Sequence, residues 1–258
     1  MRNLRLTIEY DGTNYAGWQV QPKARSVQGT IERALSQILQ EEVRLTSSGR
    51  TDAGVHALGQ VANFFTISPI DLRVLQRGVN ALLPKDIAVK EIREEDLSFH
   101  ARFSARSRVY LYRILNHPIR SGIERLYSWH VPEEIDIERM REATPFLIGE
   151  HDFSSFRGAE CKADPRRELK RLNINKKGCI IEIEMEANAF LQHMARIIVA
   201  TLVDVGRGKL APEDVKEILE AKDRSRASKT APPQGLFLKE VIYGGGSGRK
   251  PFSKGSPR

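Results

Sequence analysis

Hydrophobic and polar positions along the first hundred residues follow two periods, and each period predicts its own kind of element. Residues 4–10 alternate apolar with polar side chains, the pattern of a half-buried strand. Ser26 and Asp71 are residue types that cap helices, and apolar side chains at helical spacing follow both of them, up to Leu39 and up to Pro84. Further strands are predicted for residues 43–46, 60–67 and 87–92.

The second part of the chain repeats this mixture of elements. Strands are predicted for residues 108–116, 169–174, 179–187 and 236–243. Helices are predicted from Asp136 to Leu147, for residues 189–205, and from Pro212 to Leu219. Residues 150–167 are polar and irregular, and they predict a loop long enough to be functional.

The order of these elements predicts an α+β fold in two halves of similar size. Strands and helices mix without regular βαβ alternation, so we expect antiparallel sheets with the helices on one face, once in residues 1–97 and again in residues 98–243. Residues 244–258 are rich in Gly, Ser and basic residues, which predicts a flexible tail.

Composition excludes several protein classes. The chain has 258 residues, of which 40% are hydrophobic, enough to bury a core. Its two cysteines, Cys161 and Cys179, form no CxxC pair, which suits a reducing compartment and indicates neither a disulfide framework nor a zinc knuckle. We see no signal peptide, and the most apolar run, residues 197–205, is too short to cross a bilayer. We therefore expect a cytoplasmic protein without a membrane partner.

The charge favours an acidic partner. Lys and Arg number 41 against 33 Asp and Glu, a formal net charge of +8. Four of these net charges lie in residues 249–258, so the remaining +4 is a modest signal. Arg is frequent, and because its guanidinium binds phosphate as a fork and stacks on bases, nucleic acid is the expected partner class.

One short segment, SGRTDAGVH (residues 48–56), combines a carboxylate, a guanidinium, two hydroxyls and an imidazole within nine residues. A phosphate loop is excluded because Gln60 and Val61 follow Gly59 where such a loop needs Lys and Ser or Thr. No His or Cys spacing here or elsewhere forms a recognised metal motif, and no GxSxG motif indicates a serine nucleophile. A functional carboxylate at Asp52, beside Arg50, remains, and so does an Asp that only hydrogen-bonds its own turn.

Two other segments carry candidate chemistry. On a strand, Arg108, Tyr110 and Tyr112 share one face, which suits either stacking on an unpaired base or an aromatic core strand with exposed arginines. On a helix over residues 189–205, Gln192 and Arg196 share a sector with the neighbouring His193. Arg196 there is either the partner of a buried carboxylate or a surface residue.

Taken together, the segments resemble the tRNA pseudouridine synthase A family over residues 4–243. The segments that carry the resemblance are EYDGTNYAGWQ (9–19), SVQGTIERAL (26–35), GRTDAGVHALGQV (49–61), DIAVKEI (86–92), FHARFSARSRVYLYRI (99–114), GEHDFSSF (149–156) and ANAFLQHMARIIV (187–199). They are long, and they occur in the order of the family.

The resemblance implies two ferredoxin-like subdomains, with the active site in the cleft between them. It also implies isomerisation of uridines 38, 39 and 40 in the tRNA anticodon stem-loop to pseudouridine, without a cofactor or a metal. Asp52 matches the catalytic carboxylate, which attacks the sugar, attacks the base or removes the C2′ proton. Tyr110 matches the residue that stacks on the target uracil, Arg196 the partner of the catalytic Asp, and Arg50 the residue that enters the RNA.

The resemblance also implies two RNA-contacting segments and a homodimer in which both protomers contact one tRNA. The segments contain Phe99, His100, Ala101, Arg102, Phe103 and, in the 160–167 loop, Glu160, Cys161, Lys162, Ala163 and Asp164. The alternative function is a non-catalytic RNA-binding module that uses the same basic cleft. Mapping pseudouridine in tRNA before and after incubation with the protein separates the two.

Overall fold

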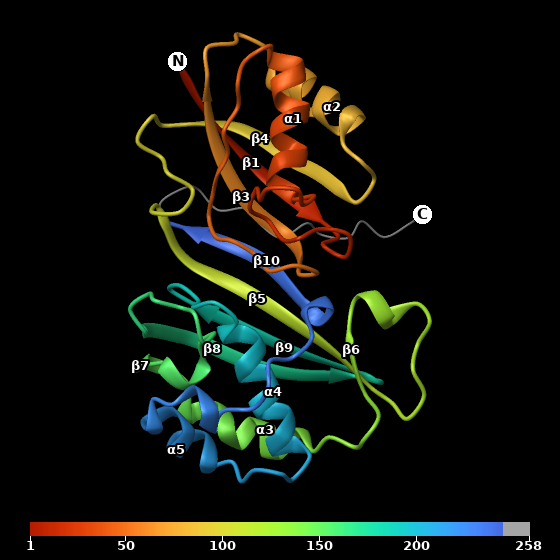
Figure 1. The fold of residues 1–258 in the computed structure, drawn as a ribbon, viewed down its shortest axis with the longest axis vertical. Coiled ribbons are helices and arrows are strands. Elements are labelled where there is room, and N and C mark those ends of the chain that lie inside the picture. Colours follow the sequence, from red (N-terminus) through yellow and green to blue (C-terminus); the bar gives the residue numbers. More distant parts are fainter. Residues whose placement is uncertain (245–258) are drawn as a thin grey trace, which may run out of the picture.

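The strands of the protein form a single mixed sheet (Figure 1). The structure is a computed structural model that describes residues 1–244. In that part of the chain ten strands join the sheet: β1 (Arg2–Tyr10), β2 (Thr46–Ser47), β3 (His56–Thr66), β4 (Ile87–Glu95), β5 (Ala105–Asn116), β6 (Trp129–Val131), β7 (Gly149–Asp152), β8 (Arg166–Lys177), β9 (Ile180–Ala187) and β10 (Leu236–Tyr243). The α-helices are α1 (Val27–Leu39), α2 (Leu72–Leu82), α3 (Ile137–Ala143), α4 (Met194–Gly206) and α5 (Asp214–Ala221).

Each half of the chain has the same strand order. The first half reads β4-β1-β3-β2 and the second β10-β5-β9-β8, and all these pairings are antiparallel. With α1 and α2 in the first half and α3 and α4 in the second, each half is a βαββαβ unit, the ferredoxin-like arrangement. The predicted α+β class and its two ferredoxin-like halves are confirmed.

Strand β10 joins the halves into one sheet, because it lies between β5 and β3 (Figure 1). Its pairing with β3 is parallel and short, and it aligns Phe237 with His56 and Leu238 with Ala57. Leu236 packs into the core of the second half, whereas Leu238 packs into the core of the first. The last strand therefore links the two cores at the point where β3 begins, at His56, the last residue of the SGRTDAGVH segment.

Local capping accounts for where three of the helices begin. Ser26 Oγ accepts a hydrogen bond from Gly29 N, and the carboxylates of Asp71 and Asp136 each accept from the first turn of α2 and α3. These side chains satisfy backbone N–H groups that have no partner within the helix. All three predicted caps are confirmed.

Several predicted boundaries were wrong. The largest error concerns α4, which begins at Met194 and not at residue 189, because His193 has a left-handed backbone (φ 63°) that interrupts the helical spiral. Gln192 and His193 thus precede the helix and do not share a helical sector with Arg196. The predicted loop 150–167 contains the end of β7 and the start of β8. Helix α3 ends at Ala143 and is followed by a 3₁₀ turn, although the predicted helix extends to Leu147. Strand β3 begins at His56, four residues before the predicted start.

Two further observations concern membrane-spanning helices and the predicted tail. Within residues 1–244, none of the helices has the length and apolar character needed to cross a membrane. The predicted tail, residues 244–258, lies outside the described residues except for Gly244.

Candidate active site

A pocket of about 830 Å³ opens where the two halves meet, a size typical of ligand sites. Its wall combines the loop 48–52 of the first half, the segment 100–103, residues of β5 and β10, and the segment 189–196 of the second half. Asp52, Tyr110, Arg196 and Arg50 all line it. The four predicted active-site residues, which come from three distant segments of the chain, therefore meet in one cavity.

The loop that carries Asp52 is held at the residues that precede the carboxylate. Gln60 is fully buried on β3; it accepts a hydrogen bond from Ser48 Oγ (2.7 Å) and donates to Gly49 O (2.9 Å). Thr51 Oγ1 lies 2.7 Å from the buried hydroxyl of Tyr10, and Thr51 O accepts from Trp18 N. These contacts fix the backbone on either side of Arg50, so the direction of the Asp52 side chain is set before any ligand binds.

Two glycines make this packing possible. A Cβ on Gly17 would lie 2.6 Å from Thr51 O, so the turn after β1 can approach the Asp52 loop only without a side chain there. Gly54 has a left-handed backbone (φ 75°) and reverses the chain after Asp52. Gly17 therefore permits the close backbone contact with the Asp52 loop, and Gly54 permits the turn that follows Asp52.

The Asp52 carboxylate pairs with a guanidinium from the other half of the molecule. Arg196 Nη1 donates to Asp52 Oδ2 at 2.9 Å, and Arg196 Nε donates to Ala231 O at 2.7 Å. His193 Nε2 lies 3.5 Å from the same Oδ2. Because both neighbours contact Oδ2, Oδ1 is the carboxylate oxygen without a protein partner among residues 1–244.

Arg50 lies apart from this ion pair. Its side chain is exposed at the pocket rim, and it forms no hydrogen bond or ion pair with any residue in the described part of the chain. Although Arg50 is two residues from Asp52, the distant Arg196 is the partner of the carboxylate. Sequence proximity alone suggested the opposite pairing.

Tyr110 lies on β5 beside the Asp52 pair. Its ring packs edge-on against Phe190, with centroids 4.9 Å apart. Burial, and next the negative charge of Asp52, raise the pKa of the Tyr110 hydroxyl above its ordinary value. The hydroxyl therefore stays protonated at neutral pH and can donate a hydrogen bond inside the pocket.

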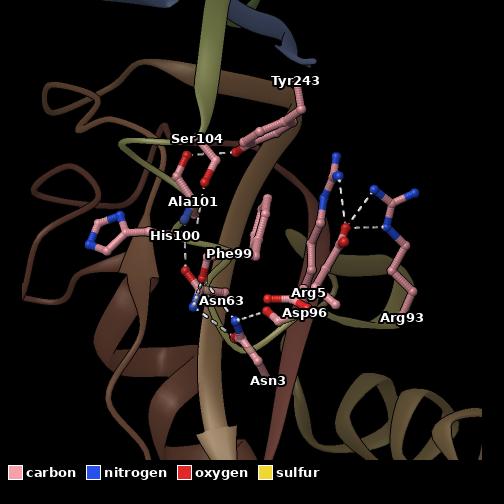
Figure 2. A network of polar contacts seen from close by, with 11 residues as sticks. Asn3, Arg5, Asn63, Arg93, Asp96, Phe99, His100, Ala101, Ser104 and Tyr243 are labelled. Atoms are coloured by element: carbon pink, nitrogen blue, oxygen red, sulfur yellow. Dashed lines mark hydrogen bonds and ion pairs between the residues drawn. The ribbon is translucent and has the colours of Figure 1, made fainter. Parts of the chain in front are cut away.

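The segment after β4 divides into anchoring and pocket-facing residues. His100, Arg102 and Phe103 line the pocket, and Figure 2 shows His100 directed away from the polar network beneath it. Ala101 is fully buried, and the Phe99 ring packs 5.1 Å from that of Tyr243. Of the five residues expected to contact RNA, two thus face the core of the first half.

The second segment expected to contact RNA also reaches the pocket. Cys161 and Ala163 line the cavity, together with Arg167. Glu160, Lys162 and Asp164 are exposed and do not line it. In residues 1–244 no group of three or more His, Cys, Asp or Glu side chains is arranged to hold a metal ion.

The sequence did not identify the residues that support Asp52. Tyr10 and Gln60 read as ordinary strand residues, since their spacing is that of a sheet. The signal that could have identified Gln60 was its place on a predicted strand next to a polar loop. A polar side chain that is buried there needs hydrogen-bond partners, and the loop supplies them. His56, the last residue of SGRTDAGVH, accepts a hydrogen bond from Gly12 N at Nδ1, and its Nε2 contacts Leu126 O. Its ring is therefore engaged by other segments and not by the Asp52 carboxylate.

The comparisons with known proteins identify the family of the chain. A model of the tRNA pseudouridine synthase family matches residues 6–104 and 143–244. The tRNA pseudouridine synthase A of Caldicellulosiruptor saccharolyticus is 48% identical over 245 residues, which covers 94% of this chain and all of the relative. The tRNA pseudouridine synthase A of Geotalea uraniireducens is 49% identical over 244 residues, with the same coverage.

A solved structure described as a Cbf5-Nop10-Gar1 complex is similar at a TM-score of 0.34 and 12% identity, over 77% of this chain and 54% of the other, a level from which no function follows. The family match and the full-length relatives are decisive. The chain belongs to the tRNA pseudouridine synthase family.

Proposed function

We propose that this chain converts uridines 38, 39 and 40 of the tRNA anticodon stem-loop to pseudouridine, with Asp52 as the catalytic carboxylate. Its family makes it an isomerase that acts on tRNA; the three positions and the residue roles are the proposal. The observation that carries it is the Asp52–Arg196 ion pair, which places one carboxylate in the pocket between the halves.

The reaction moves the ribose C1′ from N1 to C5 of the uracil, and a proton from C5 to N1. Nothing is oxidised or reduced, so side chains alone can perform it. Asp52 acts at C1′, at the base or at the C2′ proton, and in each case the carboxylate must be ionised and aimed. Arg196 contacts Oδ2, which leaves Oδ1 for the substrate.

The target nucleotide has to leave the helical stack before it can enter the pocket, at a cost of a few kcal/mol. Tyr110 supplies an aromatic face and a protonated hydroxyl for the uracil. Arg50, exposed and unpaired in residues 1–244, can enter the space that the nucleotide leaves. Arg102, Phe103 and Arg167 at the rim supply charge and stacking surface for the adjoining strand.

The test is to map pseudouridine in tRNA by carbodiimide modification, before and after incubation with the purified protein. We expect new pseudouridine at positions 38–40 with the wild type. Replacing Asp52 by Asn or Ala should lower the rate by about 10³-fold or more, while the thermal unfolding midpoint and tRNA binding stay close to wild type.

Asp152→Asn is the matched control, because Asp152 is also a partly exposed carboxylate but lies outside the pocket. It should retain wild-type activity. An active Asp52→Ala protein would refute the catalytic role. Binding of tRNA without any new pseudouridine would favour the non-catalytic RNA-binding module.

The resemblance also supports a homodimer in which both protomers contact one tRNA. Light scattering of the purified protein, with and without tRNA, should give two chains per particle and one tRNA per two chains.

A further inference from the structure

Arg108 lies on β5 two residues before Tyr110, and it connects three segments of the pocket wall. Its Nη1 donates to Asn188 O, and its Nη2 donates to both Ser48 O and Arg102 O. All three hydrogen bonds are 2.8 Å long. A planar guanidinium offers donors in a fixed fork, which is why one side chain can serve three separate carbonyl groups.

The three partners belong to the segments that carry the proposed active site. Ser48 begins the loop of Asp52 and is itself held by Gln60. Asn188 begins the segment that leads through His193 to Arg196 at the start of α4. Arg102 belongs to the segment that faces the pocket after β4. Arg108 therefore spans the two halves that supply the carboxylate and its guanidinium partner.

The segment that contains Arg102 has its other anchors on β1, β3 and β10 (Figure 2). Asn3 Nδ2 donates to Asp96 O and to Phe99 O, Asn63 Oδ1 accepts from Ala101 N, and Tyr243 OH donates to Ala101 O. Arg108 adds the contact on the pocket side. The backbone between residues 99 and 102 is thus held from both directions.

The charge of Arg108 is not neutralised locally. All three hydrogen-bond partners are backbone carbonyls, and no carboxylate in the described residues forms an ion pair with it. Burial lowers the pKa of the Arg108 guanidinium. Arg108 is partly buried, and desolvation of a cation without a carboxylate partner is costly, so the three carbonyl contacts point to a role in geometry.

We propose that Arg108 is a positioning residue, which fixes the Asp52 loop, the Arg102 segment and the segment before α4 relative to one another. This rests on the proposed function, since it concerns the alignment of the proposed catalytic pair. Lysine keeps the positive charge but has no planar fork, so it cannot hold three carbonyls in this arrangement.

The experiment compares Arg108→Lys with Arg106→Lys. Arg106 is an exposed arginine on the same strand, without a hydrogen bond or ion pair in residues 1–244. We expect Arg108→Lys to lower the single-turnover rate at saturating tRNA by about tenfold or more, while the Kd for tRNA changes less than about threefold. Amide hydrogen exchange should accelerate in residues 48–52, 99–104 and 188–193. Arg106→Lys should match the wild type in each measurement.

Wild-type turnover of Arg108→Lys, or unchanged exchange in all three segments, would overturn the positioning role. If the wild type itself makes no pseudouridine, the proposed function fails, and the exchange comparison still decides the role of Arg108 because it needs no activity. If Arg108→Lys does not fold, nitrogen-15 spectra of wild-type arginine side chains decide: separate Nη proton signals for Arg108 support the role, and averaged signals refute it.

Discussion

At the scale of single residues, the pocket brings together groups whose chemistry depends on their neighbours. The Asp52 carboxylate is part of a loop, yet its partner Arg196 comes from a helix 144 positions later in the chain. Tyr110 is a strand residue whose pKa is raised by burial and by the Asp52 charge. Each of these properties arises from the contact between the two halves.

Replacing Tyr110 by Phe tests the hydroxyl separately from the ring. The substitution keeps the ring that is proposed to stack on the base, but the pocket loses a donor that stays protonated at neutral pH. We expect the turnover rate to fall by about 10- to 100-fold with tRNA affinity nearly unchanged, measured by single-turnover kinetics and filter binding. Tyr112→Phe is the control, because its hydroxyl donates to Pro232 O and does not line the pocket. Equal effects of the two substitutions would contradict a special role for Tyr110.

At the scale of elements, the strands β1 and β3 carry polar side chains in a buried layer. Asn3 and Asn63 are almost fully buried, and Asn63 Nδ2 donates to Asn3 Oδ1 at 2.9 Å. Together they satisfy backbone groups of residues 96–101 (Figure 2). This polar pair on two regular strands gives an irregular segment a defined conformation.

Asn63→Ala should therefore act on the 96–104 segment. It leaves the buried Ala101 N–H and the Asn3 amide oxygen without their partner, and each such group costs about 1–3 kcal/mol. We expect a loss of about 2–4 kcal/mol in the free energy of unfolding, measured by urea denaturation, together with weaker tRNA binding. Asn173→Ala, an exposed strand position, should cost less than about 0.5 kcal/mol. Equal stability of the two variants would argue against the anchor.

At the scale of the whole molecule, the two halves are joined around the start of β3. His56 is buried there between the rings of Phe237 and Tyr127, and its Nε2 contacts Leu126 O at 2.9 Å. Gly12 N donates to Nδ1, which assigns the ring proton to Nε2 in the neutral imidazole. Burial lowers the pKa of His56, against the opposing effect of the Asp11 carboxylate.

The lowered pKa predicts a pH dependence of stability. The unfolded chain binds a proton at His56 at a higher pH than the folded protein does, so stability is lost as pH falls below about 6.5, toward the lower folded value. Thermal unfolding midpoints between pH 7.5 and 5 should decline in the wild type and less steeply in His56→Gln. His151→Gln, a partly exposed histidine, should retain the wild-type slope. Parallel slopes for wild type and His56→Gln would contradict this assignment.

The sequence by itself determined the elements and the family. Apolar periodicity predicted β1, α1, α2, β9 and β10 closely, because each buries one face against the sheet, and the caps at Ser26, Asp71 and Asp136 are local hydrogen bonds. The same periodicity misplaced the start of α4. The apolar residues in 189–193 continue the helical spacing, but the left-handed backbone at His193 interrupts the helix there.

Only the tertiary structure decided which groups meet. Periodicity specifies the face that a residue presents, whereas contacts between distant segments depend on how β10 joins the two halves. That junction sets Arg196, and not the neighbouring Arg50, against Asp52, and it places Arg108 where one guanidinium reaches three backbone segments. Hydrogen bonds of this kind act over about 3 Å, so they are defined by the packed chain and leave little trace in the spacing of the residues.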